Sequence, residues 1–119
     1  MKKIVCVLIL VLTAGLFSAC SKVNDEDLKK AHEAVEAGAI IVDVRTPQEY
    51  KQKHIDGAIN LPIEEIMQGH LKKLPKNKEI VVYCRTGNRS NTSAKVLREK
   101  GWSVYDVATQ ADWERKIKE

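Results

Sequence analysis

One cysteine, Cys84, stands where a nucleophile would be expected. It follows residues 80–83, I-V-V-Y, which have the length and composition of a buried strand. The residues after it, R-T-G-N-R-S, include two arginines and a glycine and lead into a helical pattern that ends at Gly101. Backbone N–H groups at such a turn can point at the sulfur, and positive charge favours its thiolate form. The pattern therefore indicates a thiolate nucleophile, the alternative being a buried structural cysteine.

The segment after Cys84 supplies the residues expected to surround a substrate. Arg89 is the candidate for stabilising an anion, and Ser90 or Asn91 is the expected cap of the helix. Arg85 is a second anion-binding candidate, with a solvated surface charge as an equally weighted alternative. The predicted site consists of Cys84 as the catalytic residue and of the substrate-binding residues Arg85, Thr86, Gly87, Asn88, Arg89 and Ser90.

The elements that must position this segment alternate between apolar runs and helix signals. We predict strands over residues 39–44, 58–61, 80–83 and 103–107, with Val23 as a candidate edge-strand residue. Helices are expected over residues 25–38, 47–53, 63–67, 91–101 and 112–117, with a short helical turn over 69–74. Such alternation favours a parallel sheet with helices on both faces and ligands at the carboxyl ends of the strands, where Cys84 lies.

Two motifs resemble those of one known family. C-R-T-G-N-R-S, residues 84–90, resembles the active-site loop of the rhodanese-like sulfurtransferases, in which a cysteine opens a six-residue cradle that an arginine closes. D-V-R-T-P-Q-E-Y-K-Q-K-H-I-D-G-A-I-N-L-P, residues 43–62, resembles that family's second signature. The resemblance covers residues 23–113 and implies the α/β rhodanese-like fold, with a central parallel sheet of about five strands and helices on both faces.

The resemblance implies sulfur transfer through a persulfide on Cys84. The thiolate would attack the outer sulfur of thiosulfate, and sulfite would leave as a weakly basic anion that needs no proton. This suits the segment from Cys84 to Ser90, which has neither a histidine nor a carboxylate. A thiol, or cyanide in an assay, would then accept the sulfur. No cofactor is implied, and no metal site is expected, because the sequence has no zinc pattern and His70 lacks a carboxylate or cysteine at metal-ligand spacing.

Two other functions stay open on the sequence alone. Cysteine phosphatases and arsenate reductases of this fold resemble C-x5-R, whereas four residues separate Cys84 from Arg89 here. The shorter segment makes a tighter bowl, which suits a sulfur atom better than a tetrahedral phosphate. The other alternative is a module without turnover, which binds a periplasmic partner or carries persulfide to it. Turnover of thiosulfate separates that module from an enzyme.

The first 19 residues have the features of an export signal. Two lysines precede an apolar run over residues 4–12, and small residues precede Cys20. L-F-S-A-C, residues 16–20, resembles the cleavage box of bacterial lipoproteins, with Phe17 where leucine is usual. Lipidation of Cys20 is therefore expected, with ordinary secretion of a soluble product as the alternative.

The predicted destination is the bacterial periplasm, with the lipid on Cys20 as a membrane anchor. Ser21, in place of aspartate, resembles the pattern that directs lipoproteins to the outer membrane of Gram-negative cells. Residues 20–119 would form one rhodanese-like domain with a short N-terminal tether. The sequence has 20 basic and 16 acidic residues, and loss of the two signal lysines leaves 18 basic residues. This charge balance is not typical of a nucleic-acid-binding protein. Cys84 would be the lone thiol of this exported protein.

Polar residues near two predicted strand ends have other interpretations. Asp43 and Arg45 are expected to form a structural pair, since polar groups there usually bond to backbone or to each other. T-P-Q-E, residues 46–49, has the form of a capping box.

After the last strand, relatives usually have a Gly-Gly turn near the active-site mouth, whereas this chain has A-T-Q, residues 108–110. We therefore expect substrate access or loop geometry to differ there.

Overall fold

The structure is a computed structural model that describes residues 23–117. The predicted signal segment and the predicted lipidation site, Cys20, lie outside these residues. Within the described part of the chain, no helix has both the length and the apolar character that a membrane span requires.

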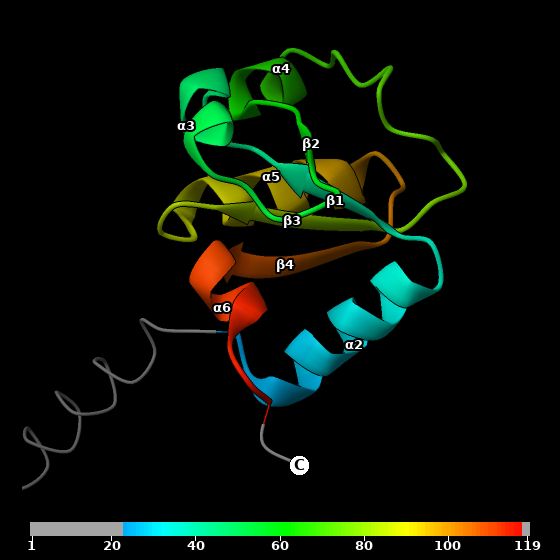
Figure 1. Cartoon of the computed structure of the whole chain (residues 1–119). Helices are drawn as coiled ribbons and strands as arrows, with labels where there is room; N and C mark the ends of the chain where they lie inside the picture. Colours follow the sequence, from blue (N-terminus) through cyan, green and yellow to red (C-terminus); the bar gives the residue numbers. More distant parts are fainter. Residues whose placement is uncertain (1–22, 118–119) are drawn as a thin grey trace, which may run out of the picture.

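Helices and parallel strands alternate along the described chain (Figure 1). The elements are, in order, α2 (Asp25–Glu36), β1 (Ile40–Asp43), α3 (Pro47–Gln52), β2 (Ile59–Asn60), α4 (Ile63–Met67), β3 (Ile80–Cys84), α5 (Asn88–Glu99), β4 (Val104–Thr109) and α6 (Gln110–Glu114). The strands lie in the order β2-β1-β3-β4, so β3 is an interior strand. This arrangement confirms the predicted α/β fold, in which the carboxyl ends of the strands share one edge.

The described sheet has four strands rather than about five. Val23, expected as an edge-strand residue, lies in no strand. Its carbonyl oxygen instead accepts a hydrogen bond from the Arg115 guanidinium at 2.7 Å. Within residues 23–117 the sheet therefore ends at β2 on one side and at β4 on the other.

Side chains along β3 alternate between the two faces of the sheet. Ile80, Val82 and Cys84 belong to the core that α4 and α5 cover. Val81 and Tyr83 belong to the opposite core, which α2 and α6 cover. Figure 1 shows α5 against the sheet and α2 and α6 below it. All five residues of β3 are buried, so Cys84 stands at the end of a strand held between two packed cores.

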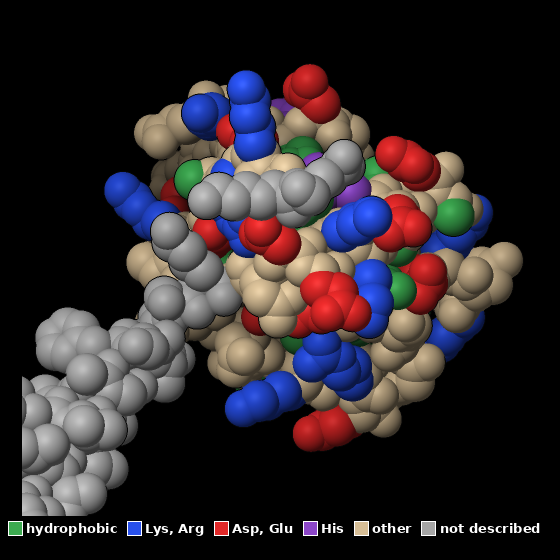
Figure 2. Space-filling view, turned by 90° about the horizontal axis from the view of Figure 1, so that it is seen from below, with side chains coloured by type: hydrophobic (Ala, Val, Ile, Leu, Met, Phe, Trp, Pro, Cys, Tyr) green, Lys and Arg blue, Asp and Glu red, His purple; other side chains and the backbone are tan. Residues whose placement is uncertain are grey.

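The face that carries α2 and α6 has a mixed surface. Figure 2 shows Lys and Arg side chains interspersed with Asp and Glu side chains across this face. This face therefore lacks the continuous basic surface that is typical of nucleic-acid binding.

Local caps set several helix boundaries as predicted. Asn24 caps α2 by accepting a hydrogen bond from the Asp27 N–H at 2.8 Å. Thr46 and Glu49 form the predicted capping box at the start of α3. Helix α4 spans the predicted residues. These boundaries depend on side chains within a few residues of each other, which is why the sequence predicts them.

Helix α5 begins earlier than predicted. Its first residue is Asn88 and its N-cap is Gly87, so the predicted caps, Ser90 and Asn91, already lie in the helix. Gly87 has a φ of 100°, a left-handed value that glycine adopts without steric strain. Asn88, Arg89 and Ser90 therefore form the first turn of α5 and are not part of a loop.

Two more boundaries differ from the prediction. Residues 69–74 form turns and no helix. Strand β4 continues to Thr109, and α6 starts at Gln110 rather than at Asp112. The reason is the cap, because the Thr109 hydroxyl accepts a hydrogen bond from the Asp112 N–H at 3.0 Å. Trp113 is 9% exposed and anchors this helix, as predicted.

Candidate active site

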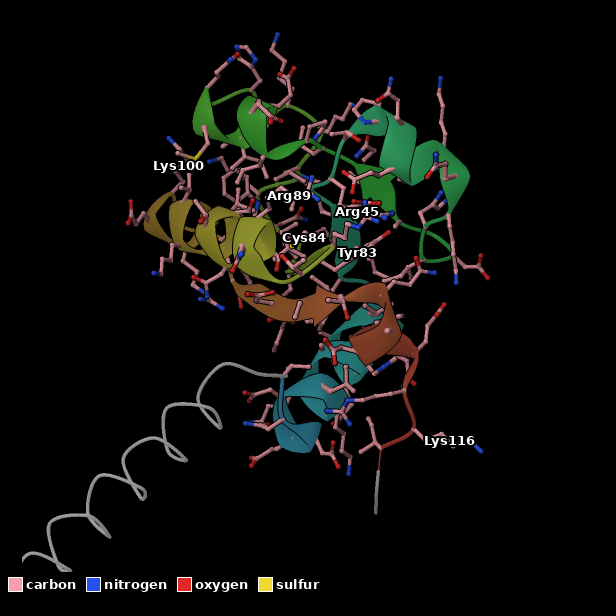
Figure 3. The ribbon with its side chains drawn as sticks, turned by 90° about the vertical axis from the view of Figure 1, so that its left-hand side faces the viewer. Arg45, Tyr83, Cys84, Arg89, Lys100 and Lys116 are labelled. Carbon is pink, nitrogen blue, oxygen red and sulfur yellow. The ribbon has the colours of Figure 1, made fainter. Side chains whose placement is uncertain are left out.

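Cys84 ends β3 at the carboxyl edge of the sheet, and Figure 3 views the molecule from this edge. Its side chain is almost fully buried, with 2% of the residue exposed. The sulfur accepts two backbone hydrogen bonds, from the Gly87 N–H at 3.0 Å and from the Ser90 N–H at 3.2 Å. This geometry confirms the expectation that N–H groups after the strand point at the sulfur. Two converging donors stabilise negative charge on that atom.

The first turn of α5 holds this arrangement in place. Ser90 is fully buried, and its hydroxyl donates to the Gly87 carbonyl oxygen at 3.1 Å. This bond ties together the two residues whose N–H groups reach Cys84. The positive end of the dipole of a 12-residue helix also points toward the sulfur. The sulfur therefore faces fixed partial positive charge.

A carboxylate from another element reaches the active-site segment. Glu49, in α3, accepts hydrogen bonds from both terminal nitrogens of Arg89, at 2.9 and 3.2 Å. A nitrogen of Arg85 lies 3.8 Å from the same carboxylate, although its side chain is 75% exposed. From the sequence, the one role predicted for Glu49 is its part in the capping box. Glu49 lies 40 residues from Arg89, and no local pattern indicates the pairing.

The pairing stabilises the charged forms of Glu49 and Arg89. The hydrogen bond from Arg89 is the main cause that lowers the pKa of Glu49 to about 2, although burial acts in the opposite direction. The Glu49 carboxylate in turn raises the pKa of Arg89, and the nearby Cys84 adds a smaller contribution of the same sign. Figure 3 shows Arg89 beside Cys84. The site thus holds a fixed ion pair next to the sulfur.

The six predicted substrate-binding residues occupy different environments. Gly87 and Ser90 contact the Cys84 sulfur through their N–H groups. Arg89 is partly buried and bound to Glu49. The remaining three residues are exposed, and these are Arg85, Thr86 and Asn88. The structure therefore brings the backbone of the segment together at the sulfur, while most of its side chains face solvent.

Asp43 and Arg45 form a structural network with Tyr83, the residue before Cys84. The Asp43 carboxylate is fully buried and accepts hydrogen bonds from the Tyr83 hydroxyl at 2.9 Å and the Arg45 guanidinium at 2.7 Å. The Tyr83 oxygen accepts a further bond from the Ile55 N–H at 3.1 Å. Burial is the main cause that raises the pKa of Tyr83 above its usual value. The network joins β1 to β3 and agrees with the structural role predicted for the pair.

The end of β4 lies close to the site. It contains the segment in which the sequence of this chain was expected to differ from that of its relatives. Val82 pairs with Asp106 and Cys84 pairs with Thr109, so β4 has one extra residue there. Ala108 lies in this bulge with a φ of 65°. The segment in which the sequence predicts a difference from relatives, residues 108–110, therefore includes a bulge directly beside the end of β3.

Metal-ligating residues do not gather in the described structure. Among residues 23–117, no three side chains of histidine, cysteine, aspartate or glutamate are placed to hold one metal ion. Cys84 is also a free thiol. The groups around the sulfur in the described site are its two N–H donors and the neighbouring ion pair.

Comparison with known proteins points to one family. The chain matches the rhodanese-like domain over residues 25–109. It is 38% identical to the thiosulfate sulfurtransferase PspE of Escherichia coli over 68 residues, which are 56% of this chain and 65% of that protein. It is 34% identical to a putative mitochondrial thiosulfate sulfurtransferase of Schizosaccharomyces pombe over 93 residues, with 66% of each chain covered. The chain thus spans just under two thirds of PspE.

Solved structures agree with this result. A rhodanese with anions from E. coli is 31% identical, with a TM-score of 0.59, and the match covers 66% of this chain and 95% of that one. The human single-domain sulfurtransferase TSTD1 shares the fold, with a TM-score of 0.62 at 20% identity over 75% of this chain and 95% of that one. The fold, the matched residues and the sulfurtransferase relatives agree, and the chain therefore belongs to the rhodanese-like domain family of sulfurtransferases.

Proposed function

We propose that this protein transfers a sulfane sulfur from thiosulfate, or from a persulfide donor, to a thiol acceptor through a persulfide on Cys84. Cyanide would serve as the acceptor in an assay. The observation that carries the proposal is the Cys84 sulfur, which accepts N–H bonds from Gly87 and Ser90 at the positive end of α5. The sulfurtransferase relatives support the same class of reaction.

The reaction proceeds in two displacements at sulfur. The Cys84 thiolate attacks the outer sulfur of thiosulfate, a new S–S bond forms, and the old S–S bond breaks with its electron pair on sulfite. The acceptor thiolate or cyanide then attacks the same outer sulfur and returns Cys84 as the thiolate. Negative charge enters and leaves at each step, so the Gly87 and Ser90 N–H groups can stabilise it throughout. Such double displacement gives ping-pong kinetics.

The state of Glu49 favours this reaction over phosphate hydrolysis. An alkoxide leaving group needs a proton donor, whereas sulfite does not. Glu49 is the carboxylate that binds Arg89 beside the sulfur, and with a pKa of about 2 it is ionised at neutral pH. It therefore has no proton to donate. This supports the sulfurtransferase interpretation over the phosphatase alternative.

The mass of the purified protein before and after treatment with thiosulfate tests the proposal. We expect the mass to increase by one sulfur atom, and we expect cyanide to remove it with formation of thiocyanate. A Cys84→Ser variant is the control and should show neither change. If the native protein gained no sulfur, or if the variant gained it equally, Cys84 would not be the carrier. A protein that gained sulfur but did not turn over would support the persulfide-carrying module instead.

We also propose that the protein acts in the periplasm, held to a membrane by a lipid on Cys20. The support is the export signal and the lipoprotein-like box at residues 16–20. Native protein should partition into detergent and incorporate labelled palmitate, and Cys20→Ser should abolish both. Recovery of the native protein in the soluble periplasmic fraction would show that the box with Phe17 is not processed.

A further inference from the structure

Ala108 has a backbone conformation that side chains rarely adopt. Its φ of 65° is the one positive value at a non-glycine residue among residues 23–117. Glycine would adopt this conformation without the steric cost that a β-carbon brings. Strained residues persist where the surrounding structure holds them, and they are concentrated at functional sites.

Strand β4 holds Ala108 from both sides. Val82 pairs with Asp106, and Cys84 pairs with Thr109. The segment of β4 between these two pairs is therefore one residue longer than the facing segment of β3. The Ala108 N–H donates to the Asp106 carboxylate at 2.9 Å. Thr109, the next residue, caps α6. The bulge thus fixes Ala108 across from the end of β3, where Cys84 lies.

The Ala108 methyl group packs against Gly87. A β-carbon built on Gly87 would lie 3.4 Å from the Ala108 β-carbon and 3.9 Å from its α-carbon. Gly87 also has a left-handed backbone, and as the N-cap of α5 it has no side chain to make a cap bond. Its N–H is one of the two that reach the Cys84 sulfur, at 3.0 Å. Ala108 therefore contacts the residue that directs a donor at the sulfur.

We propose that Ala108 is a positioning residue for the thiolate cradle. Its methyl group lies next to Gly87, on the side where an L-residue would carry its β-carbon, and keeps the Gly87 N–H directed at the Cys84 sulfur. Ser90 holds the same residue through its bond to the Gly87 carbonyl oxygen, at 3.1 Å. This role rests on the proposed function, because the Gly87 N–H that Ala108 positions bonds to the Cys84 sulfur, the proposed carrier of the transferred atom. Ala108 itself acts through Gly87.

The pH dependence of Cys84 alkylation by iodoacetamide tests this role without any sulfur donor. In Ala108→Gly, the Gly87 N–H loses its packing partner and stabilises the thiolate less well. We expect the midpoint of the pH–rate profile to rise by about half a unit to one unit, with alkylation about three- to tenfold slower below it. Thermal stability should not decrease, because glycine relieves the backbone strain. Easier access to the sulfur would change the plateau rate and leave the midpoint unaltered.

Two matched variants complete the experiment. Ala108→Ser keeps the β-carbon and should keep the native midpoint, and Ala37→Gly, at the exposed C-cap of α2, should behave like the native protein. An unchanged midpoint in Ala108→Gly, or an equal shift in Ala108→Ser, would overturn the proposal. Failure of the native protein to take sulfur from thiosulfate would instead reject the proposed function. The alkylation comparison would still decide the role of Ala108.

Discussion

Glu49→Gln removes the charge that holds Arg89 while it keeps the cap of α3. Both oxygens of Glu49 accept hydrogen bonds from Arg89, and one of them also accepts from the Thr46 N–H at 3.1 Å. Glutamine can retain the bond to Thr46, since a capping box accepts either residue at this position. The substitution therefore isolates the contribution of the ion pair beside Cys84.

The lowered pKa of Glu49 gives the size of the expected effect. The pKa falls from its ordinary value to about 2, mainly because of the hydrogen bond from Arg89. At about 1.4 kcal/mol per pKa unit, the variant should lose up to about 3 kcal/mol of unfolding free energy at neutral pH. The folded-state pKa lies below the unfolded one, so this contribution is complete above about pH 5 and disappears as the pH falls toward about 2. The variant should lack that part of the pH dependence.

Urea unfolding of both proteins at pH 7 and at pH 3 measures this effect. Glu65→Gln is the control, because Glu65 pairs with His70 at the surface and is 47% exposed. Its substitution should change the stability by less than about 0.5 kcal/mol. If Glu49→Gln matched the native stability at pH 7, or kept the native pH dependence, the argument for a stabilising ion pair would be wrong.

The same variant tests whether Glu49 acts through Arg89 in sulfur transfer. Without its anchor, Arg89 should stabilise the anionic substrate less well, and we expect kcat/KM to fall by about tenfold, less than on loss of a full donor. Adding Glu49→Gln to Arg89→Ala should then cost nothing further, because the two residues act as one unit. Additive losses in the double variant would show that Glu49 works independently of Arg89.

Four further predictions concern the site and its support. Arg89→Ala should lower kcat/KM for thiosulfate by about 100-fold; an unchanged value in the thiosulfate–cyanide assay would remove Arg89 from the site. One glycine inserted between Gly87 and Asn88 should displace the Ser90 N–H from the sulfur and lower sulfur transfer by at least about tenfold. The native protein should hydrolyse aryl phosphates negligibly, and faster turnover of aryl phosphate than of thiosulfate would refute the assignment. Tyr83→Phe should lower stability by about 1–3 kcal/mol, because the buried Ile55 N–H loses its acceptor; urea unfolding that matches the native protein would contradict this.

Local sequence patterns determine the strand that carries Cys84 and the helices that begin with strong caps. The run I-V-V-Y predicts β3 and places Cys84 at its end, because a buried interior strand is apolar on both faces. The capping box predicts the start of α3, and α4 has the predicted bounds. Each of these features depends on residues within a few positions of each other. Their physical cause is therefore visible in the sequence alone.

The start of α5 lies at the limit of local prediction. Ser90 and Asn91 are both good caps by residue type, yet the cap is Gly87, three to four residues earlier. Glycine can take many backbone conformations, so its presence does not say which one the chain adopts. In the structure Gly87 is left-handed, Ala108 lies next to it, and the Gly87 carbonyl oxygen accepts a hydrogen bond from the Ser90 hydroxyl.

The tertiary structure alone decides which groups surround the sulfur. Glu49 reaches Arg89 across 40 residues because α3 and α5 both start at the carboxyl edge of the parallel sheet. Ala108 reaches Gly87 because a bulge in β4 lies beside the end of β3. Both contacts depend on strand order and register, which are set by the packing of the whole core. The sequence therefore places Cys84 at the end of a buried strand, whereas the fold supplies the ion pair and the packing around it.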